Sequence, residues 1–91
     1  MIGAAQIRAA RALLGIGQRE LSRIAEVAIS TVKRIELARE ITGSARTLWK
    51  LQTALEKAGV DFIPADEQKG PGVRLKDRLG TQPKRRRKRG G

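Results

Sequence analysis

The polar side chains best suited to recognising a ligand are grouped near the middle of the chain. Ser30 and Arg34 stand four residues apart, so they share one face wherever this segment is helical. A guanidinium such as that of Arg34 can donate two hydrogen bonds to the O6 and N7 atoms of guanine. The ammonium of Lys33 is a flexible point charge that suits phosphate. These groups can therefore bind both base edges and a phosphate backbone.

Residues 18–36 contain two short amphipathic segments on either side of a break. The second segment has its polar groups on one side, and Val32 and Ile35 on the other side are expected in the core. This layout is typical of a helix-turn-helix, in which one helix braces against DNA backbone and the next enters the major groove. The predicted recognition helix spans about 28–37.

Enzymatic chemistry finds little support in the residue types. The chain has no His, Cys or Tyr, which excludes His-based acid–base catalysis, thiol nucleophiles and the common soft-metal sites. Asp66 and Glu67 are adjacent in a predicted loop and indicate a solvated turn. Gly70-Pro71-Gly72 is too short and too stiff to cradle a phosphate. We expect no enzyme, no cofactor and no metal ion.

The net charge of +11 is distributed unevenly over the 91 residues. Residues 1–67 hold ten Lys/Arg and eight Asp/Glu, a net charge of +2, whereas residues 68–91 carry +9. A phosphate-rich partner is the natural interpretation of such a charge. The length allows one domain with a small core. No apolar run of 18 residues and no signal-peptide pattern occurs, so we expect no membrane span, and the lack of cysteine is compatible with a reducing cytosol.

The basic residues end in a tail with the sequence KRRRKR at 84–89. From residue 76 onward there is too little apolar content to fold, which predicts disorder. The tail is expected to add non-specific affinity for phosphate. The alternative, that it is only a solvated tail aiding solubility, remains open.

Apolar spacing predicts four short helices. They span 4–14, 18–25, 28 or 29 to about 37, and about 44–58. Ser44 suits an N-cap and Gly59 a C-cap. The side chains expected in the core are Ile7, Ala10, Leu13, Leu14, Leu21, Ala25, Val32, Ile35, Leu48, Leu51, Leu55 and Ala58. Trp49 lies beside this stripe, and its expected role is packing, either in the core or in a dimer contact.

After Gly59 the apolar period changes to that of short extended segments. They predict a hairpin within 60–75, with Pro71-Gly72 at the centre of a type II turn. The predicted organisation is therefore a DNA-binding domain at 1–59, the extended segments at 60–75, and the basic tail at 76–91.

Several of these motifs, in this order, resemble the Cro/C1-type (XRE) helix-turn-helix regulators of bacteria and phages. The resemblance covers about 4–58 and is carried by IRxxR at 7–11, QxEL at 18–21 and STVKRIE at 30–36. It implies an all-α, lambda repressor-like bundle of four to five helices, followed here by the hairpin and the tail. It also implies a sequence-specific transcriptional regulator of double-stranded DNA that acts as a homodimer on a two-fold operator, in the bacterial cytoplasm at the nucleoid.

The resemblance also implies roles for single residues. Gln18 would contact a phosphate at the start of its helix, Ile29, Ser30 and Arg34 would read bases, and Arg11 with Glu36 would form an internal bridge. The full set predicted to contact DNA is Gln18, Arg19, Ala28, Ile29, Ser30, Thr31, Lys33, Arg34, Arg39, Thr42, Ser44 and Arg46.

Two departures from the family pattern fall within the turn of the motif. Glu26 stands where the family usually has glycine, and a positive φ there would cost about 1 kcal/mol. Ala28 replaces the usual hydroxyl residue, which removes a capping bond of about the same value. The sequence therefore predicts a locally weakened turn.

Two other functions remain open. An antitoxin-like chain could use the same fold for autoregulation and a different surface to block a partner protein. RNA binding through the arginine-rich tail is a further alternative, although the chain lacks an aromatic stacking platform.

Overall fold

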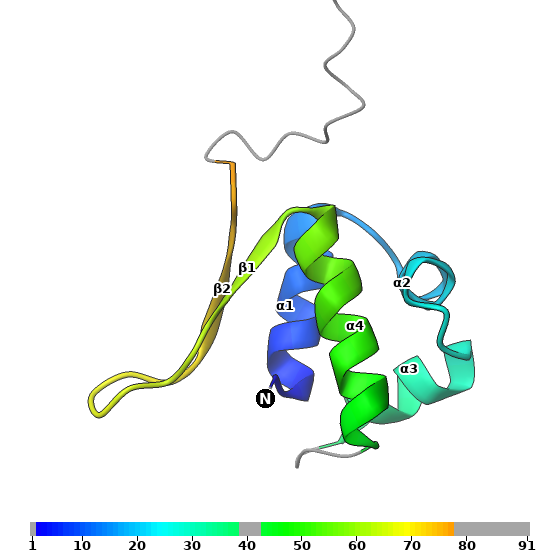
Figure 1. The fold of residues 1–91 in the computed structure, drawn as a ribbon, viewed down its shortest axis with the longest axis horizontal. Coiled ribbons are helices and arrows are strands. Elements are labelled where there is room, and N and C mark those ends of the chain that lie inside the picture. The colour runs from blue at the N-terminus through cyan, green and yellow to red at the C-terminus, as the bar shows by residue number, and fades with distance from the viewer. Residues whose placement is uncertain (1, 39–42, 78–91) are drawn as a thin grey trace, which may run out of the picture.

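A computed structural model describes residues 2–38 and 43–77 of the chain (Figure 1). The described elements are α1 (Ala4–Leu14), α2 (Gln18–Ala25), α3 (Ile29–Leu37), α4 (Ala45–Ala58), β1 (Val60–Ile63) and β2 (Gly72–Leu75). The helix bounds agree with the sequence prediction to within a residue, and the predicted hairpin is present. The fold is thus small and mostly helical, with one antiparallel hairpin.

The two longest helices form the centre of the molecule. α1 and α4 pack side by side, with the hairpin against them on one side and α2 and α3 on the other (Figure 1). α3 packs on α1 and α2, so it lies at the edge of the fold farthest from the hairpin. Among the described residues, this arrangement leaves one side of α3 exposed to solvent.

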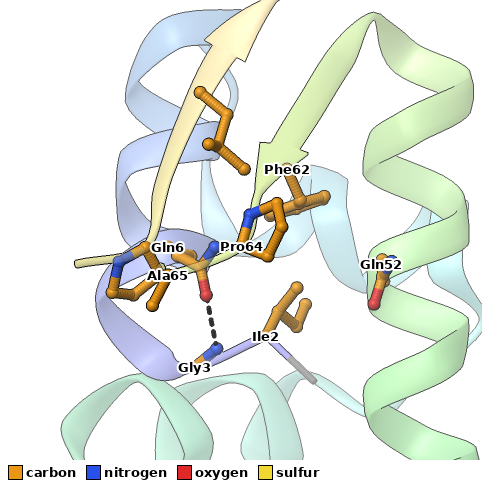
Figure 2. A pocket seen from close by; sticks show the side chains of 9 residues that line it. Ile2, Gly3, Gln6, Gln52, Phe62, Pro64 and Ala65 are labelled. Atoms are coloured by element: carbon orange, nitrogen blue, oxygen red, sulfur yellow. Dashed lines mark hydrogen bonds between the residues drawn. The ribbon is translucent and has the colours of Figure 1, made fainter. Parts of the chain in front are cut away.

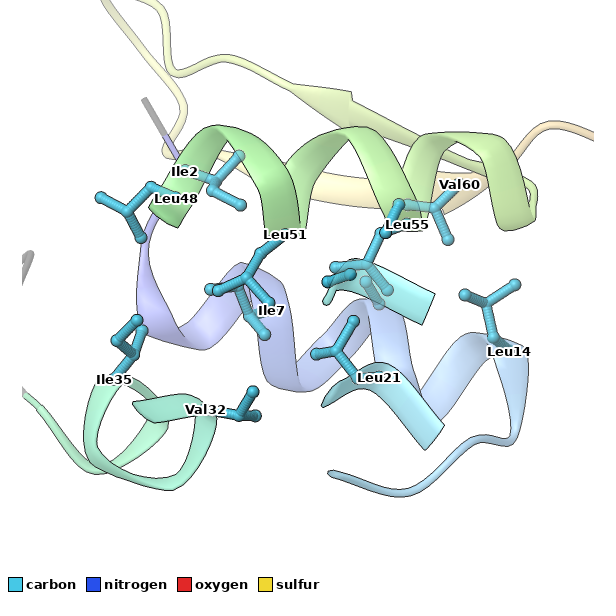
Figure 3. Close-up of a cluster of buried hydrophobic side chains, with 13 residues drawn as sticks. Ile2, Ile7, Leu14, Leu21, Val32, Ile35, Leu48, Leu51, Leu55 and Val60 are labelled. Atoms are coloured by element: carbon cyan, nitrogen blue, oxygen red, sulfur yellow. The ribbon is translucent and has the colours of Figure 1, made fainter. Parts of the chain in front are cut away.

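The core is aliphatic, as predicted. Ile7, Leu21, Val32, Leu51 and Leu55 converge between the four helices and are almost inaccessible to solvent (Figure 3). Burying aliphatic side chains of this size contributes about 1.5–3 kcal/mol each. The whole cluster therefore fixes where α3 lies.

Two core assignments made from periodicity, Leu13 and Ala58, need correction, and the core alternative for Trp49 is excluded. Leu13 is 42% exposed and Trp49 is 65% exposed, so neither belongs to the core. Ala58 is only partly buried, and Ala54 takes a buried place on the same helix. Phe62 is partly buried and packs against the core.

The helix ends follow from local chemistry. α1 ends at Gly15, whose φ of 71° is left-handed, and the amide of Ile16 donates to the Arg11 carbonyl at 3.1 Å. That pair is typical of a Schellman motif. At the start of α4 the Ser44 hydroxyl accepts the amide of Thr47 at 3.1 Å, which confirms the predicted N-cap.

The hairpin is attached to the helices by a buried amide. Gln6 Nε2 donates to the Gly72 carbonyl at 3.0 Å, and its Oε1 accepts the Gly3 amide at 3.1 Å. The side chain is 8% exposed, so these bonds satisfy a polar group that would otherwise destabilise the fold. At the other end, the amide of Lys76 donates to the Gly59 carbonyl at 2.8 Å.

The predicted type II turn is wrong. Gly72 already belongs to β2, opposite Ile63, and its φ is not positive as a type II turn requires. The chain instead turns at Asp66, whose carboxylate accepts the amides of Gln68 and Lys69 at 2.8 and 2.7 Å. The loop therefore has an Asx-type turn at Asp66 and not the predicted turn at Pro71-Gly72, because the Asp66 carboxylate satisfies two backbone donors.

The described chain ends at Asp77. Residues 76 and 77, which the sequence predicts to begin the disordered tail, belong to the described part of the chain. The Lys76 amide donates to the Gly59 carbonyl. The rest of that predicted tail, residues 78–91, lies outside the described residues. Among the helices of residues 2–38 and 43–77, none combines the length and the apolarity needed to span a membrane.

Candidate nucleic-acid interface

The turn between α2 and α3 has the predicted strained residue. Glu26 has φ 57° and ψ 47°, the left-handed conformation in which glycine is preferred. Ala28 precedes α3 with no side-chain capping bond, also as predicted. The turn therefore has the left-handed residue and lacks the side-chain cap on which the expected weakness depends.

Ser22 stabilises this turn, a role that no pattern in the sequence indicated. Ser22 Oγ donates to the Val27 carbonyl at 2.6 Å, and the Val27 amide donates back to the Ser22 carbonyl at 3.1 Å. A hydroxyl five residues before a backbone carbonyl gives no periodic signal, so this role depended on knowing the turn geometry. The two bonds hold the start of α3 against α2.

The two sides of α3 differ as predicted. Val32 and Ile35 are buried, whereas Ser30, Lys33 and Arg34 are exposed. Ile29 and Thr31 are half-buried at the first turn. One side of the helix thus anchors it to the core, and the other presents a hydroxyl and two cations to solvent.

Leu37 adds an apolar group at the end of α3. It is 84% exposed and lies seven residues after Ser30, hence near the same side of the helix. The apolar period of the sequence predicts only that the helix ends near residue 37. The side chain gives the outer surface an apolar contact beside its polar ones.

The Arg11–Glu36 bridge implied by the family resemblance is present. Arg11 Nε lies 2.8 Å from Glu36 Oε2, and Arg11 Nη2 lies 2.8 Å from Oε1, which is a bidentate pair. Glu36 is 4% exposed. Its hydrogen bond and charge raise the pKa of Arg11 above its ordinary value. The pair joins α1 to the last turn of α3.

Gln18 has a partner that the sequence did not indicate. Its Nε2 donates to Glu36 Oε1 at 3.1 Å, so the first side chain of α2 is tied to the same buried carboxylate. The guanidinium of Arg8 also donates to the main-chain carbonyl of Glu36. The end of α3 is therefore held by groups from both α1 and α2.

The other residues predicted to contact DNA fall into three groups. Arg19, Ala28 and Arg46 are exposed. Ser44 is exposed too, but its hydroxyl also caps α4. Arg39 and Thr42 lie outside the described residues.

A hollow of about 530 Å³ lies away from this surface, under the hairpin loop (Figure 2). Its lining is Ile2, Gly3, Gln6, Gln52, Phe62, Ile63, Pro64, Ala65 and Pro71. None of these side chains is charged or carries a hydroxyl, and the Gln6 amide already bonds to Gly3 and Gly72. The hollow therefore offers mainly apolar contact.

Comparison with models of protein families finds no match, and comparison with curated proteins finds no significant one. Within the part of the chain that the structure describes, no group of three or more His, Cys, Asp or Glu could hold a metal ion. The features of the described residues that bear on function are therefore the exposed side of α3 and the groups that hold this helix.

Proposed function

We propose that the chain is a sequence-specific double-stranded DNA-binding regulator, similar to the Cro/C1-type helix-turn-helix proteins. One observation carries the proposal: α3 is anchored by Val32 and Ile35 while Ser30, Lys33 and Arg34 are exposed along its other side. The major groove of B-DNA admits an α-helix presented in this way.

The side chains of α3 divide between base reading and phosphate binding. Arg34 is assigned to guanine, with about 1–3 kcal/mol of discrimination against a wrong base. Ile29 and Ser30 are assigned to neighbouring bases, Ile29 through the thymine methyl group. Lys33 is assigned to phosphate, which it attracts without regard to sequence.

Contacts to the backbone position the protein on the duplex. The start of α2 follows Gly17, which supplies no side-chain cap, and the positive end of the helix dipole there suits a phosphate. Arg19 and Arg46 are exposed cations that extend this contact, together with Ser44 and, outside the described residues, Arg39 and Thr42. The basic segment 84–89 adds affinity that depends on salt.

The active form is proposed to be a homodimer on a two-fold operator, in the bacterial cytoplasm at the nucleoid. Trp49, 65% exposed on α4, supports a dimer contact through α4 and the 60–75 segment. Half-sites would then lie about 34 Å apart. A monomer mass that is independent of concentration in ultracentrifugation, with and without operator DNA, would contradict the dimer.

The test of DNA reading is selection of bound duplexes from a random pool, repeated with single variants. Arg34→Ala should relax the preference at one base position, and Lys33→Ala should weaken all sequences alike. Lys57→Ala is a matched control, because Lys57 is exposed near the end of α4. No enriched sequence with the unaltered chain would remove the proposal. Equal, uniform losses from Arg34→Ala and Lys33→Ala would remove the base-reading assignment.

A further inference from the structure

We propose that Gln18 is a positioning residue that sets the start of α2 against the end of α3 through the Glu36 carboxylate. This inference rests on the proposed function, because α2 and α3 are the helices assigned to DNA. It changes the role that the family resemblance implied for Gln18, which was direct contact with a phosphate. In this role the Gln18 side chain positions α3, the helix assigned to base reading, through its bond to Glu36.

The buried carboxylate of Glu36 accepts hydrogen bonds from α1 and from α2. Its Oε1 accepts from Arg11 Nη2 at 2.8 Å and from Gln18 Nε2 at 3.1 Å, and its Oε2 accepts from Arg11 Nε at 2.8 Å. The carboxylate is 4% exposed, so it depends on these donors in place of water. A hydrogen bond to a buried charge is stronger than one between neutral groups. The Gln18 amide is therefore held in place before DNA binds.

Gln18 and Glu36 lie at the ends of their helices. Gln18 is the first residue of α2, and Glu36 stands one residue before the end of α3. Arg11 also donates from Nη1 to the Ile16 carbonyl at 3.2 Å, which fixes the link between α1 and α2. A single carboxylate thus connects the phosphate-facing end of α2 with the helix that carries Arg34.

The Gln18–Glu36 bond bears on DNA recognition through the position of α3 relative to α2. Contacts to phosphate fix the register of a protein on the duplex, and only in that register do the base-reading groups meet their bases. Without the Gln18–Glu36 bond, α2 can dock on phosphate while α3 lies less firmly in the groove. Binding to the preferred sequence should fall more than binding to any other duplex.

The experiment compares Gln18→Ala with Arg19→Ala in the full chain. Affinity is measured for the duplex selected from the random pool and for a scrambled duplex. Gln18→Ala should lower the ratio of the two affinities about tenfold, the effect of one lost bond to a charged group. Arg19→Ala should lower both affinities and leave the ratio unchanged. Equal losses on both duplexes with Gln18→Ala would overturn the positioning role and restore direct phosphate contact.

A measurement without DNA separates this inference from the proposed function. In the nuclear magnetic resonance spectrum of the full chain, Gln18→Ala should shift the Arg11 Nε–H signal and the Leu37 amide, whereas Arg19→Ala should shift neither. An unmoved Arg11 signal in Gln18→Ala would overturn the coupling. If no sequence is enriched from the random pool but the Arg11 signal moves, the coupling between helices stands and the DNA proposal fails.

Discussion

Ser22 and Val27 exchange two hydrogen bonds across the turn between α2 and α3. The Ser22 hydroxyl donates to the Val27 carbonyl at 2.6 Å, and the Val27 amide donates to the Ser22 carbonyl at 3.1 Å. The same turn contains Glu26 in a left-handed conformation and begins α3 without a side-chain cap. The bonds of Ser22 therefore offset the strain of this turn and the missing cap.

Ser22→Ala should lower the free energy of unfolding by about 1 kcal/mol, because the buried part of the turn loses one hydrogen bond. Urea denaturation followed by circular dichroism measures the change. Ser30→Ala is the matched control, since Ser30 is exposed on α3 and should give little change. Equal stability of the two variants would show that the Ser22 hydroxyl does not support the turn.

Glu26→Gly should raise the free energy of unfolding by about 1 kcal/mol, because glycine adopts a φ of 57° without steric cost. In a domain of this size that corresponds to a rise in Tm of about 4–8 °C. Glu26→Ala is the control, since it removes the carboxylate and keeps the strain. If both variants stabilise equally, the charge of Glu26 is the cause and its backbone conformation is not.

Arg11→Ala should lower the free energy of unfolding by about 3 kcal/mol, because the Glu36 carboxylate, 4% exposed, loses its charged partner. Thermal and urea denaturation measure the loss. Arg23→Ala is the control, because Arg23 pairs with Glu20 on an exposed surface, where such pairs contribute little. A small loss from Arg11→Ala, similar to that of the control, would contradict the structural role of the buried bridge.

The hairpin loop should be sensitive to acid through Asp66. Its carboxylate accepts the amides of Gln68 and Lys69, and these bonds lower the pKa of Asp66 below its ordinary value. A lowered folded-state pKa means that the stabilisation is complete above the ordinary aspartate pKa of about 4 and is lost as the pH falls through the folded-state value. The protection of the Gln68 and Lys69 amides from exchange, measured against the intrinsic exchange rate at each pH, should therefore fall in acid.

The matched variant for the loop is Asp66→Asn, which removes the charge and keeps the shape. Its exchange at Gln68 and Lys69 should be faster at neutral pH and should lack the acid transition attributed to Asp66. A transition of the same size in Asp66→Asn would assign the acid sensitivity to another group.

Replacing the six basic residues at 84–89 by Ser and Gln should make the salt dependence of DNA binding less steep. If all six neutralise phosphates, the slope of log affinity against log salt changes by about 5 units. The sequence selected from the random pool should stay the same, because the tail carries no base reading. An unchanged slope would leave the tail a role in solubility alone.

Local patterns predicted the elements well because helix starts and stops depend on near neighbours. Gly15, Ser44 and Gly59 each act within one turn of the residue that they cap, so they could be recognised from the sequence. The exposure of Leu13 and Trp49 could not be recognised in this way. Helical spacing shows which residues share a face, and the packing of other helices decides how wide a strip of that face is covered.

The sequence by itself determined the helix bounds, the aliphatic core and the concentration of charge at the C-terminal end. Only the tertiary structure decided that Gln6 attaches the hairpin and that Gln18 bonds to Glu36. The physical reason is the range of the interactions. Caps and apolar periods act over a few residues, whereas a buried polar group finds its partner only after distant helices have packed.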